Sequence, residues 1–272
     1  MLARLRSRVA RALPDGVAHR ISRLRRTAEP DPLDNVAYNR RLWDWYARTW
    51  SEDPAFRVQQ ADVPPPTAED ASRLSVLGGE WGTPRDLEHV LSEYLDPFAH
   101  ADSVVGEIGS GGGRIAARLA PRVAELYCFD ISEGMLDHAK RTLAGHTNVR
   151  YVLLKRPSLP LELRNHFDLL YSFDVFVHLD LHTIWRYIRE VAAALRPGGH
   201  AFLHTANLAA PGGWASFESQ ERYRPESHYF ISPEIVRTMV GHTDLRFVKE
   251  STPEPDNFYL NRDYLFVLQR PV

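Results

Sequence analysis

Several features that are common in proteins are missing from this sequence. Cysteine occurs once, at Cys128, so an internal disulfide framework and a zinc site built on several cysteines are both excluded. No stretch of eighteen consecutive apolar residues is present, so the sequence offers no candidate for a membrane-spanning helix. Internal repeats and low-complexity tracts are also absent. We therefore expect a soluble protein of a reducing compartment, the cytoplasm.

Beyond the first thirty residues, acidic side chains outnumber basic ones. Residues 1–30 contain eight Arg and two acidic residues, whereas the rest of the chain has 25 basic and 33 acidic residues. Nucleic-acid-binding domains usually carry a basic surface, so this acidic body predicts no nucleic-acid partner. The basic segment has apolar residues at helical spacing, from Leu2 to Leu13. Two interpretations remain open: it contacts a membrane surface or a partner protein, or it is a solvated terminal arm.

The composition is that of an ordinary globular domain. Of the 272 residues, 44% are hydrophobic and 25% are charged. We divide the chain into a basic arm at residues 1–35, a helical cap or lid at 36–98, and a main domain at 99–272. The main domain includes a substrate-facing insertion at about 208–231, which we expect to be a loop rich in glycine and aromatic residues.

Short apolar segments alternate with amphipathic helices in the main domain. Strands are predicted at 104–108, 124–129, 149–154, 167–173, 200–205, 245–250 and 264–269, and helices at 114–119, 133–143, 182–195 and 233–240. Such alternation with short turns predicts an α/β fold with helices on both faces of a mostly parallel sheet. We expect a Rossmann-like sheet of seven strands, preceded by an N-terminal helical cap with predicted helices at 36–50 and 84–94.

A glycine cluster follows the first of these strands. Residues 106–114 read Gly-Glu-Ile-Gly-Ser-Gly-Gly-Gly-Arg and lead from a strand into a helix. A backbone without side chains turns sharply and approaches a ligand closely. Asp130 ends the next strand, 21 residues after Gly109, where a carboxylate accepts hydrogen bonds from ribose hydroxyls. The loop and the acid together predict a cofactor that contains a nucleoside.

The residues around the loop narrow the choice of cofactor. A dinucleotide fingerprint requires Gly or Ala at the sixth position, and counting from Gly109 places Arg114 there. Glu107, two residues before Gly109, suits a cationic group such as an α-amino group. The segment 107–113 has the pattern acid-x-Gly-x-Gly-x-Gly and resembles the first motif of the class I S-adenosylmethionine-dependent methyltransferases.

Three further segments extend this resemblance over about residues 100–206. Residues 129–132 (Phe-Asp-Ile-Ser) resemble the segment around the acid at the end of the family's second strand. Residues 167–172 resemble its fourth-strand signature, and residues 195–199 resemble the turn before its fifth strand. Many relatives have an acid after the third strand, against the adenine, where this chain has Lys155, so no side chain is assigned to the adenine. The resemblance implies that S-adenosyl-L-methionine is held by Glu107, Gly109, Gly111, Gly113, Asp130, Ile131 and Ser172.

The resemblance places the segment after the fourth strand beside the methyl group. His178 in this segment is the candidate general base, because imidazole titrates near neutral pH and a hydroxyl acceptor must lose its proton. The alternative is that His178 caps or lines the next helix without touching substrate. A magnesium-type site is a further alternative, although the spacing matches no well-defined site and Asp180 also suits a helix N-cap. Its weak candidate ligands are Asp174, His178, Asp180 and His182.

Acceptor recognition is expected from Trp81, His204 and Trp214. The favoured function is methylation of a hydroxyl on a small molecule, with a saccharide or glycoside ahead of a phenolic, carboxyl or amine acceptor. In place of the Asn/Asp-Pro-Pro-aromatic motif of amide- and amine-methylating relatives, this chain has Asp-Val-Phe-Val at residues 174–177. An NAD(P)-linked oxidoreductase and a catalytically silent cofactor-binding module remain as alternatives. The sequence does not predict the oligomeric state.

Overall fold

The computed structural model describes residues 34–50, 76–79, 81–222 and 227–272. The basic arm therefore lies outside the described residues, apart from its last two positions. Within the described ranges, no helix combines the length and the apolar character needed to cross a membrane.

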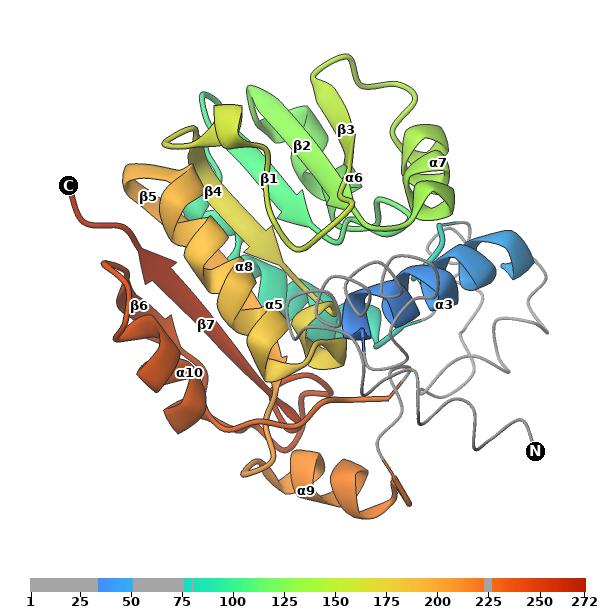
Figure 1. The fold of residues 1–272 in the computed structure, drawn as a ribbon, viewed down its shortest axis with the longest axis vertical. Coiled ribbons are helices and arrows are strands. Elements are labelled where there is room, and N and C mark those ends of the chain that lie inside the picture. The colour runs from blue at the N-terminus through green and yellow to red at the C-terminus, as the bar shows by residue number, and fades with distance from the viewer. Residues whose placement is uncertain (1–33, 51–75, 80, 223–226) are drawn as a thin grey trace, which may run out of the picture.

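Seven strands form one sheet in the order β3-β2-β1-β4-β5-β7-β6 (Figure 1). Strands β1 to β5 pair in parallel, whereas β7 runs antiparallel to both β5 and β6. The predicted Rossmann-like, mostly parallel sheet of seven strands is thus confirmed. The strands are β1 (Val104–Ile108), β2 (Glu125–Asp130), β3 (Val149–Leu153), β4 (Phe167–Ser172), β5 (Leu195–Ala206), β6 (Arg246–Glu250) and β7 (Asp263–Gln269).

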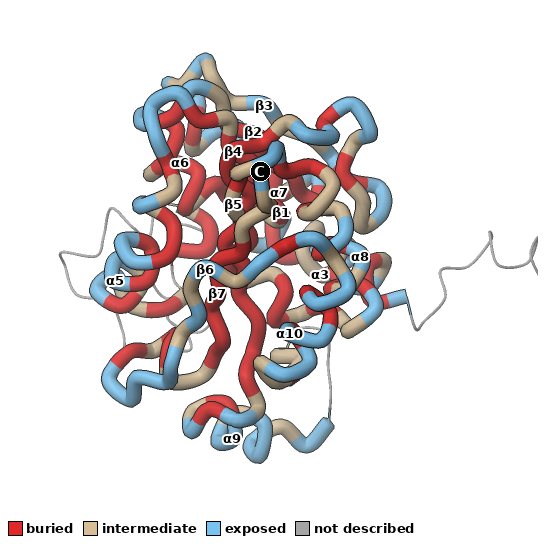
Figure 2. Tube along the Cα trace, turned by 90° about the vertical axis from the view of Figure 1, so that its left-hand side faces the viewer, coloured by how far each residue is buried: buried red, intermediate tan, exposed pale blue. Residues whose placement is uncertain are grey.

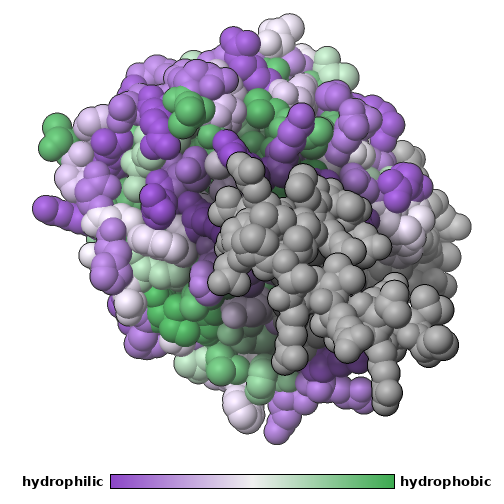
Figure 3. Space-filling model, viewed as in Figure 1, coloured by the Kyte–Doolittle hydropathy of each residue, from purple (hydrophilic) through white to green (hydrophobic). Residues whose placement is uncertain are grey.

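Helices cover both faces of this sheet, as expected from its apolar strands. The apolar sides of α8 and α10 pack on one face, and those of α5, α6 and α7 pack on the other. In Figure 2, α5 and α6 lie to the left of the sheet, and α8 and α10 lie to the right. The outward surface seen in Figure 3 is mainly hydrophilic, as solvent-facing sides of amphipathic helices are. The helices are α3 (Asn35–Thr49), α5 (Pro84–Tyr94), α6 (Ala116–Leu119), α7 (Glu133–Thr142), α8 (Leu181–Ala194), α9 (Pro211–Glu218) and α10 (Pro233–Val240).

Side-chain caps fix where several of these helices begin. Asp34 accepts hydrogen bonds from two backbone N–H groups at the start of α3, and Thr83 and Ser132 each accept one at the starts of α5 and α7. Asp180 caps α8 in the same way. Because Ser132 lies two residues after the end of β2, its cap sets α7 directly beside the carboxyl end of that strand.

Helix α3 lies across the carboxyl ends of the parallel strands, beside α7 (Figure 1). Arg40 donates hydrogen bonds from α3 to the backbone oxygens of Ile131, Leu154 and Lys155, which follow β2 and β3. The Ser132 hydroxyl donates to Asp44 at 2.6 Å. These contacts attach α3 to the edge of the sheet where ligands bind in open α/β folds.

Three elements differ from the sequence-based expectation. The insertion is not only a loop, because residues 211–218 form α9, with Pro211 in its first turn. Strand β5 begins at Leu195 rather than at residue 200, since Gly198 and Gly199 exchange backbone hydrogen bonds with Arg270. Helix α6 begins at Ala116 rather than at residue 114, because the glycine turn continues to Gly113, whose φ is +85°.

Candidate active site

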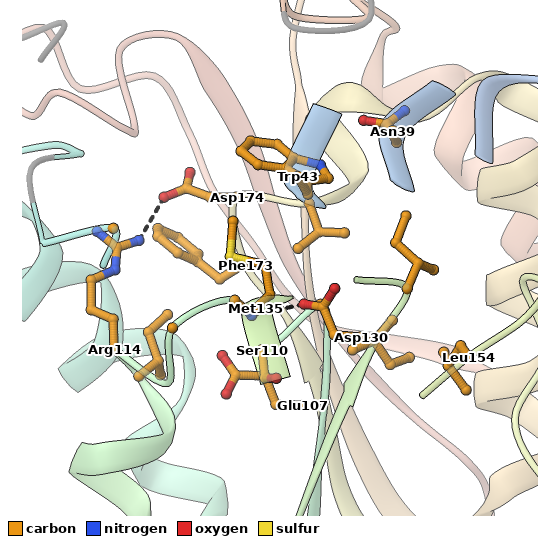
Figure 4. Close-up of a pocket in the computed structure, with 18 of the residues that line it drawn as sticks. Asn39, Trp43, Glu107, Ser110, Arg114, Asp130, Met135, Leu154, Phe173 and Asp174 are labelled. Atoms are coloured by element: carbon orange, nitrogen blue, oxygen red, sulfur yellow. Dashed lines mark hydrogen bonds and ion pairs between the residues drawn. The ribbon is translucent and has the colours of Figure 1, made fainter. Parts of the chain in front are cut away.

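A cavity of about 870 Å³, including the space at its open mouth, lies at the carboxyl ends of β1, β2 and β4. Figure 4 shows Trp43 and Asn39 projecting from α3 on one side, and Glu107 and Asp130 across from them. Arg114 and Asp174 close one end of the cavity, and Leu154 lies at the other end. The lining therefore joins the glycine loop to segments far away in the sequence.

The glycine loop forms the floor of this cavity. The N–H groups of Gly109 and Ser110 both donate to the Phe129 oxygen, at 2.7 and 3.0 Å, which ties the loop to β2. Gly109 has a φ of +76°, and a Cβ there would overlap the Val175 side chain. Gly111 has a φ of +52°, and a Cβ there would meet no protein atom within 4 Å. Gly111 thus borders open space in the cavity, where a ligand can come close to the backbone.

Asp130 joins the loop to the start of α7. One carboxylate oxygen accepts the Gly111 N–H at 2.9 Å, and the other accepts the Ser132 N–H at 2.8 Å. Each oxygen retains a second lone pair for a ligand hydroxyl. Burial raises the pKa of Asp130 to about 6, although the backbone N–H donors oppose this. The carboxylate is held where a ribose diol can reach it, and Ile131 beside it also lines the cavity.

Glu107 supplies a buried acid beneath the loop. Its side chain lines the cavity, and its Oε2 atom has no hydrogen-bond partner among the described residues. Burial raises the pKa of Glu107 to about 8, although Tyr171 and Arg114 nearby oppose this. A cationic ligand group would give this carboxylate the partner that it lacks. The site therefore fits a nucleoside that carries an amino-acid end.

The other end of the cavity is apolar. Ile131, Met135, Leu154 and Tyr187 line it, whereas Lys155 is exposed and is not part of the lining. Apolar walls of this kind suit a nucleobase, and no side-chain carboxylate is needed to form them.

Asp174 separates this cavity from a second one. Its backbone adopts a φ of +56°, which is uncommon for a residue other than glycine. Its Oδ2 accepts a hydrogen bond from Arg114 Nη2 at 2.8 Å, and Arg114 Nη1 donates to the Trp81 oxygen at 2.8 Å. Both charged side chains are largely buried, so this pair forms a fixed wall.

The second cavity measures about 1260 Å³ to its open mouth and shares Trp43, Trp81 and Asp174 with the first. We call it the acceptor cavity. Aromatic and apolar side chains make up most of its wall. Its other lining residues are Tyr38, Leu42, Trp45, Tyr46, Gly82, Val177, His178, His228, Phe258, Tyr259 and Arg262.

His178 lines the acceptor cavity. Its Nδ1 lies 3.1 Å from the Ser227 oxygen, and a carbonyl oxygen only accepts, so Nδ1 carries the hydrogen. The lone pair on Nε2 is then available for a proton. Burial lowers the pKa of His178, and so the imidazole is neutral at neutral pH. The Trp43 ring packs edge-on against it, with ring centroids 5.4 Å apart.

The four weak metal-ligand candidates do not converge. Asp174 pairs with Arg114, Asp180 caps α8 through Thr183, and His182 is exposed on that helix. In the described part of the chain, no group of three or more His, Cys, Asp or Glu side chains is arranged to hold a metal ion.

Four other predicted site residues lie away from the cavity linings. His204 is fully buried beneath Asp174, accepts its N–H on Nδ1 at 3.1 Å, and has Nε2 3.0 Å from Asp263. Trp214 is exposed on α9, beside Phe217. The Ser172 hydroxyl donates to the Ile108 oxygen, and Gly113 packs near Ala139. Direct ligand contacts of these four residues stay predictions.

Several lining residues were not among the predicted site residues. Asn39 and Trp43 come from α3, and Tyr259 and Arg262 come from the segment before β7. Trp43 belongs to the aromatic run of the helix predicted at 36–50. No sequence motif marks the other three, because they reach the site only through the tertiary fold. Arg114 was detectable, since it directly follows the glycine loop.

The fold and the lining of the first cavity suit a nucleoside cofactor with a cationic end. Residues 105–199 match a family model described as a methyltransferase domain. Two ubiquinone biosynthesis O-methyltransferases are each 26% identical to this chain. The match to the Idiomarina loihiensis enzyme covers 56% of this chain and 64% of that protein, and the match to the Vibrio campbellii enzyme covers 65% and 79%.

Solved structures share the fold at low sequence identity. Magnesium protoporphyrin IX methyltransferase from Synechocystis PCC 6803, with bound S-adenosylmethionine, has a TM-score of 0.57 at 16% identity, covering 89% of this chain and 100% of that one. A methyltransferase from Aquifex aeolicus has a TM-score of 0.53 at 18% identity, and the match covers 80% of this chain and 98% of that one. Residues 105–199 are thus similar to a methyltransferase domain, and the chain shares the fold of solved S-adenosylmethionine-dependent methyltransferases. The cofactor that this likeness implies is S-adenosylmethionine.

Proposed function

We propose that this methyltransferase transfers its methyl group to a hydroxyl oxygen of a small molecule, with a saccharide or glycoside as the first acceptor to test. The observation that carries the proposal is the position of His178. Its imidazole is neutral, has its hydrogen on Nδ1, and lines the acceptor cavity, which adjoins the first cavity. A hydroxyl needs such a base, because its proton leaves as the oxygen attacks.

The residues of the first cavity suit S-adenosylmethionine. Glu107 would hold the α-amino group and Asp130 the ribose hydroxyls, while Ile131 and Leu154 would contact the adenine. When bound, the cofactor supplies an electrophilic methyl group on a sulfonium. The protein contributes alignment of the acceptor, exclusion of water by the aromatic walls, and removal of the proton by His178.

The walls of the acceptor cavity support a ring-shaped acceptor. Trp and Tyr faces stack on sugar rings and on aromatic rings, and their polar edges form hydrogen bonds. A phenolic acceptor is the second candidate, and the aromatic wall supports it. Two relatives named as ubiquinone biosynthesis O-methyltransferases support transfer to oxygen in either case.

The proposal is tested with cofactor carrying a ¹³C-labelled methyl group. The acceptors are methyl α-D-glucopyranoside, catechol, benzoate and ethanolamine, and the products are analysed by mass spectrometry and carbon NMR. We expect a methyl ether from the glycoside or from catechol. A methyl ester or a methylamine as the only product would contradict the proposal.

Substitution of His178 tests the proposed base. His178→Ala should lower turnover by roughly 10²–10⁴-fold and leave affinity for S-adenosylhomocysteine unchanged. In the wild type the rate should rise with pH and level off below pH 6.5, because burial lowers the pKa of His178 below 6.5. This rise should vanish in the variant.

The control is His182→Ala, which changes an exposed histidine four residues away and should retain full turnover. Treatment with EDTA separates the magnesium alternative. If EDTA abolishes turnover and magnesium restores it, a metal rather than His178 activates the hydroxyl.

A further inference from the structure

Arg262 lines the acceptor cavity but has no part in the mechanism above. Its side chain is 12% exposed, and it lies immediately before the start of β7. Nε and Nη2 donate to both carboxylate oxygens of Asp263 at 2.8–3.1 Å, and the guanidinium lies over the Phe258 ring. Nη1 makes no hydrogen bond to any residue that the structure describes. Arg262 is therefore rigidly held and has donors left for a ligand.

The charge of Arg262 is already compensated. Asp263 is fully buried, and although burial opposes its ionisation, Arg262 and His204 outweigh this and keep the pKa of Asp263 below its usual value. Elsewhere in the wall, the Asp174 carboxylate is paired with Arg114. An anionic acceptor group at Arg262 would lose its hydration without meeting a net positive charge. A neutral oxygen that accepts a hydrogen bond avoids this cost.

Arg262 faces the same space as the two histidines of the cavity. The His178 and His228 rings stack with centroids 5.8 Å apart. After burial, Arg262 is the largest influence that lowers the pKa of His228, and it also lowers that of His178. A ring-shaped acceptor with one hydroxyl at His178 would thus be near the guanidinium.

We propose that Arg262 is a specificity-determining residue that donates a hydrogen bond from Nη1 to a second, uncharged oxygen of the acceptor. The acceptor class is then a ring with at least two uncharged oxygens, such as a sugar diol or a catechol. A ring with a single hydroxyl, or with a carboxylate, is a poorer ligand. This inference rests on the proposed function for the use of the cavity as the acceptor site.

The test measures binding rather than methyl transfer. Catechol, phenol and benzoate share one flat ring and differ in the number and charge of their oxygens. Their dissociation constants are measured by NMR titration of the protein saturated with S-adenosylhomocysteine. We expect the wild type to bind catechol roughly tenfold more tightly than phenol, the usual value of a hydrogen bond to a charged donor. Benzoate should bind no more tightly than phenol.

Two variants remove the proposed hydrogen bond. Arg262→Lys keeps the charge beside Asp263 but loses the planar fork, and the double variant R262M/D263N removes both charges, so no buried carboxylate is left unpaired. Unchanged affinity for S-adenosylhomocysteine shows that a variant is folded. If the double variant does not fold, R262K alone decides the test. The control is Arg237→Gln, which breaks an exposed ion pair with Glu250 outside the cavity.

The preference for catechol should disappear in the Arg262 variants and persist in R237Q. The inference is overturned if the wild type binds catechol and phenol equally tightly, or if it binds neither of them detectably. It is also overturned if benzoate binds most tightly, or if the preference survives in the folded variants. Because no methyl transfer is measured, failure here is distinct from failure of the labelled-methyl experiment.

Discussion

Replacement of Glu107 by Gln should change both cofactor binding and the stability of the free protein. Glu107 is buried, and its Oε2 lacks a hydrogen-bond partner among the described residues. Burial raises its pKa from an ordinary value of 4.5 to about 8, so the carboxyl group of the free protein is protonated at neutral pH. Binding of a cationic amino group favours the ionised form, and binding should therefore release a proton.

The magnitude of both effects follows from this pKa. Below pH 8, release of one proton makes the affinity for S-adenosylhomocysteine rise about tenfold per pH unit. Above pH 8 the affinity should stop rising, because Glu107 is then already ionised in the free protein. A raised carboxyl pKa also means that the free protein loses stability as the pH rises from 4.5 towards 8. The full loss is on the order of 5 kcal/mol.

Isothermal titration calorimetry in two buffers of different ionisation enthalpy counts the released protons. At pH 6.5 we expect the wild type to release close to one proton more than Glu107→Gln, because any proton released by Asp130 is common to both proteins. The variant should bind S-adenosylhomocysteine roughly tenfold to a hundredfold more weakly at pH 8, since a hydrogen bond to a charged group is lost. Its melting temperature without ligand should exceed that of the wild type above pH 8. Equal proton release by both proteins would refute the assignment of Glu107 to the amino group.

Two further substitutions test whether the first cavity binds the cofactor. Gly111→Val should abolish binding of S-adenosylhomocysteine, because the new side chain would enter space that is open in the structure, and the φ of +52° adds a modest loss of stability. The control is Gly145→Val, because Gly145 also borders open space but does not line the cavity. If both variants bind S-adenosylhomocysteine equally well, the loop does not contact the cofactor. Asp130→Ala should weaken S-adenosylhomocysteine by roughly 1–3 kcal/mol in calorimetry. Unchanged affinity would remove Asp130 from the ribose site.

The part of the first cavity that the glycine loop and Asp130 line could be located from the sequence, because its signals are local. Gly109, Gly111 and Asp130 stand at strand ends, and alternating apolar segments reveal those strands directly in the sequence. The parallel order then brings the strand ends to one edge of the sheet. The structure adds that Asp130 also accepts the Gly111 N–H, so the predicted ribose ligand also holds the loop.

The acceptor half was only partly predictable. His178 follows β4 and was found by its position, but Arg262 and Tyr259 lie more than eighty residues further along the chain and have no motif. Trp214 was chosen because aromatic residues suit a binding loop, whereas the residues around it form α9 and leave its ring exposed. Residues 197–199 read as a turn, yet their pairing with Arg270 extends β5. Contacts between distant segments decide such positions, and periodicity does not encode them.

Incubation of the protein with ¹³C-methyl-labelled S-adenosylmethionine and fractionated cell extract is the most direct test of methylation at a small-molecule hydroxyl. Mass spectrometry locates every compound that gains the label, and the carbon shift of the methyl group identifies the atom to which it is bound. We expect the label in a small molecule, at the shift of a methyl ether, and with a yield that falls at least a hundredfold with His178→Ala. Label in protein or RNA, or a methyl group on nitrogen or carbon, would contradict this function.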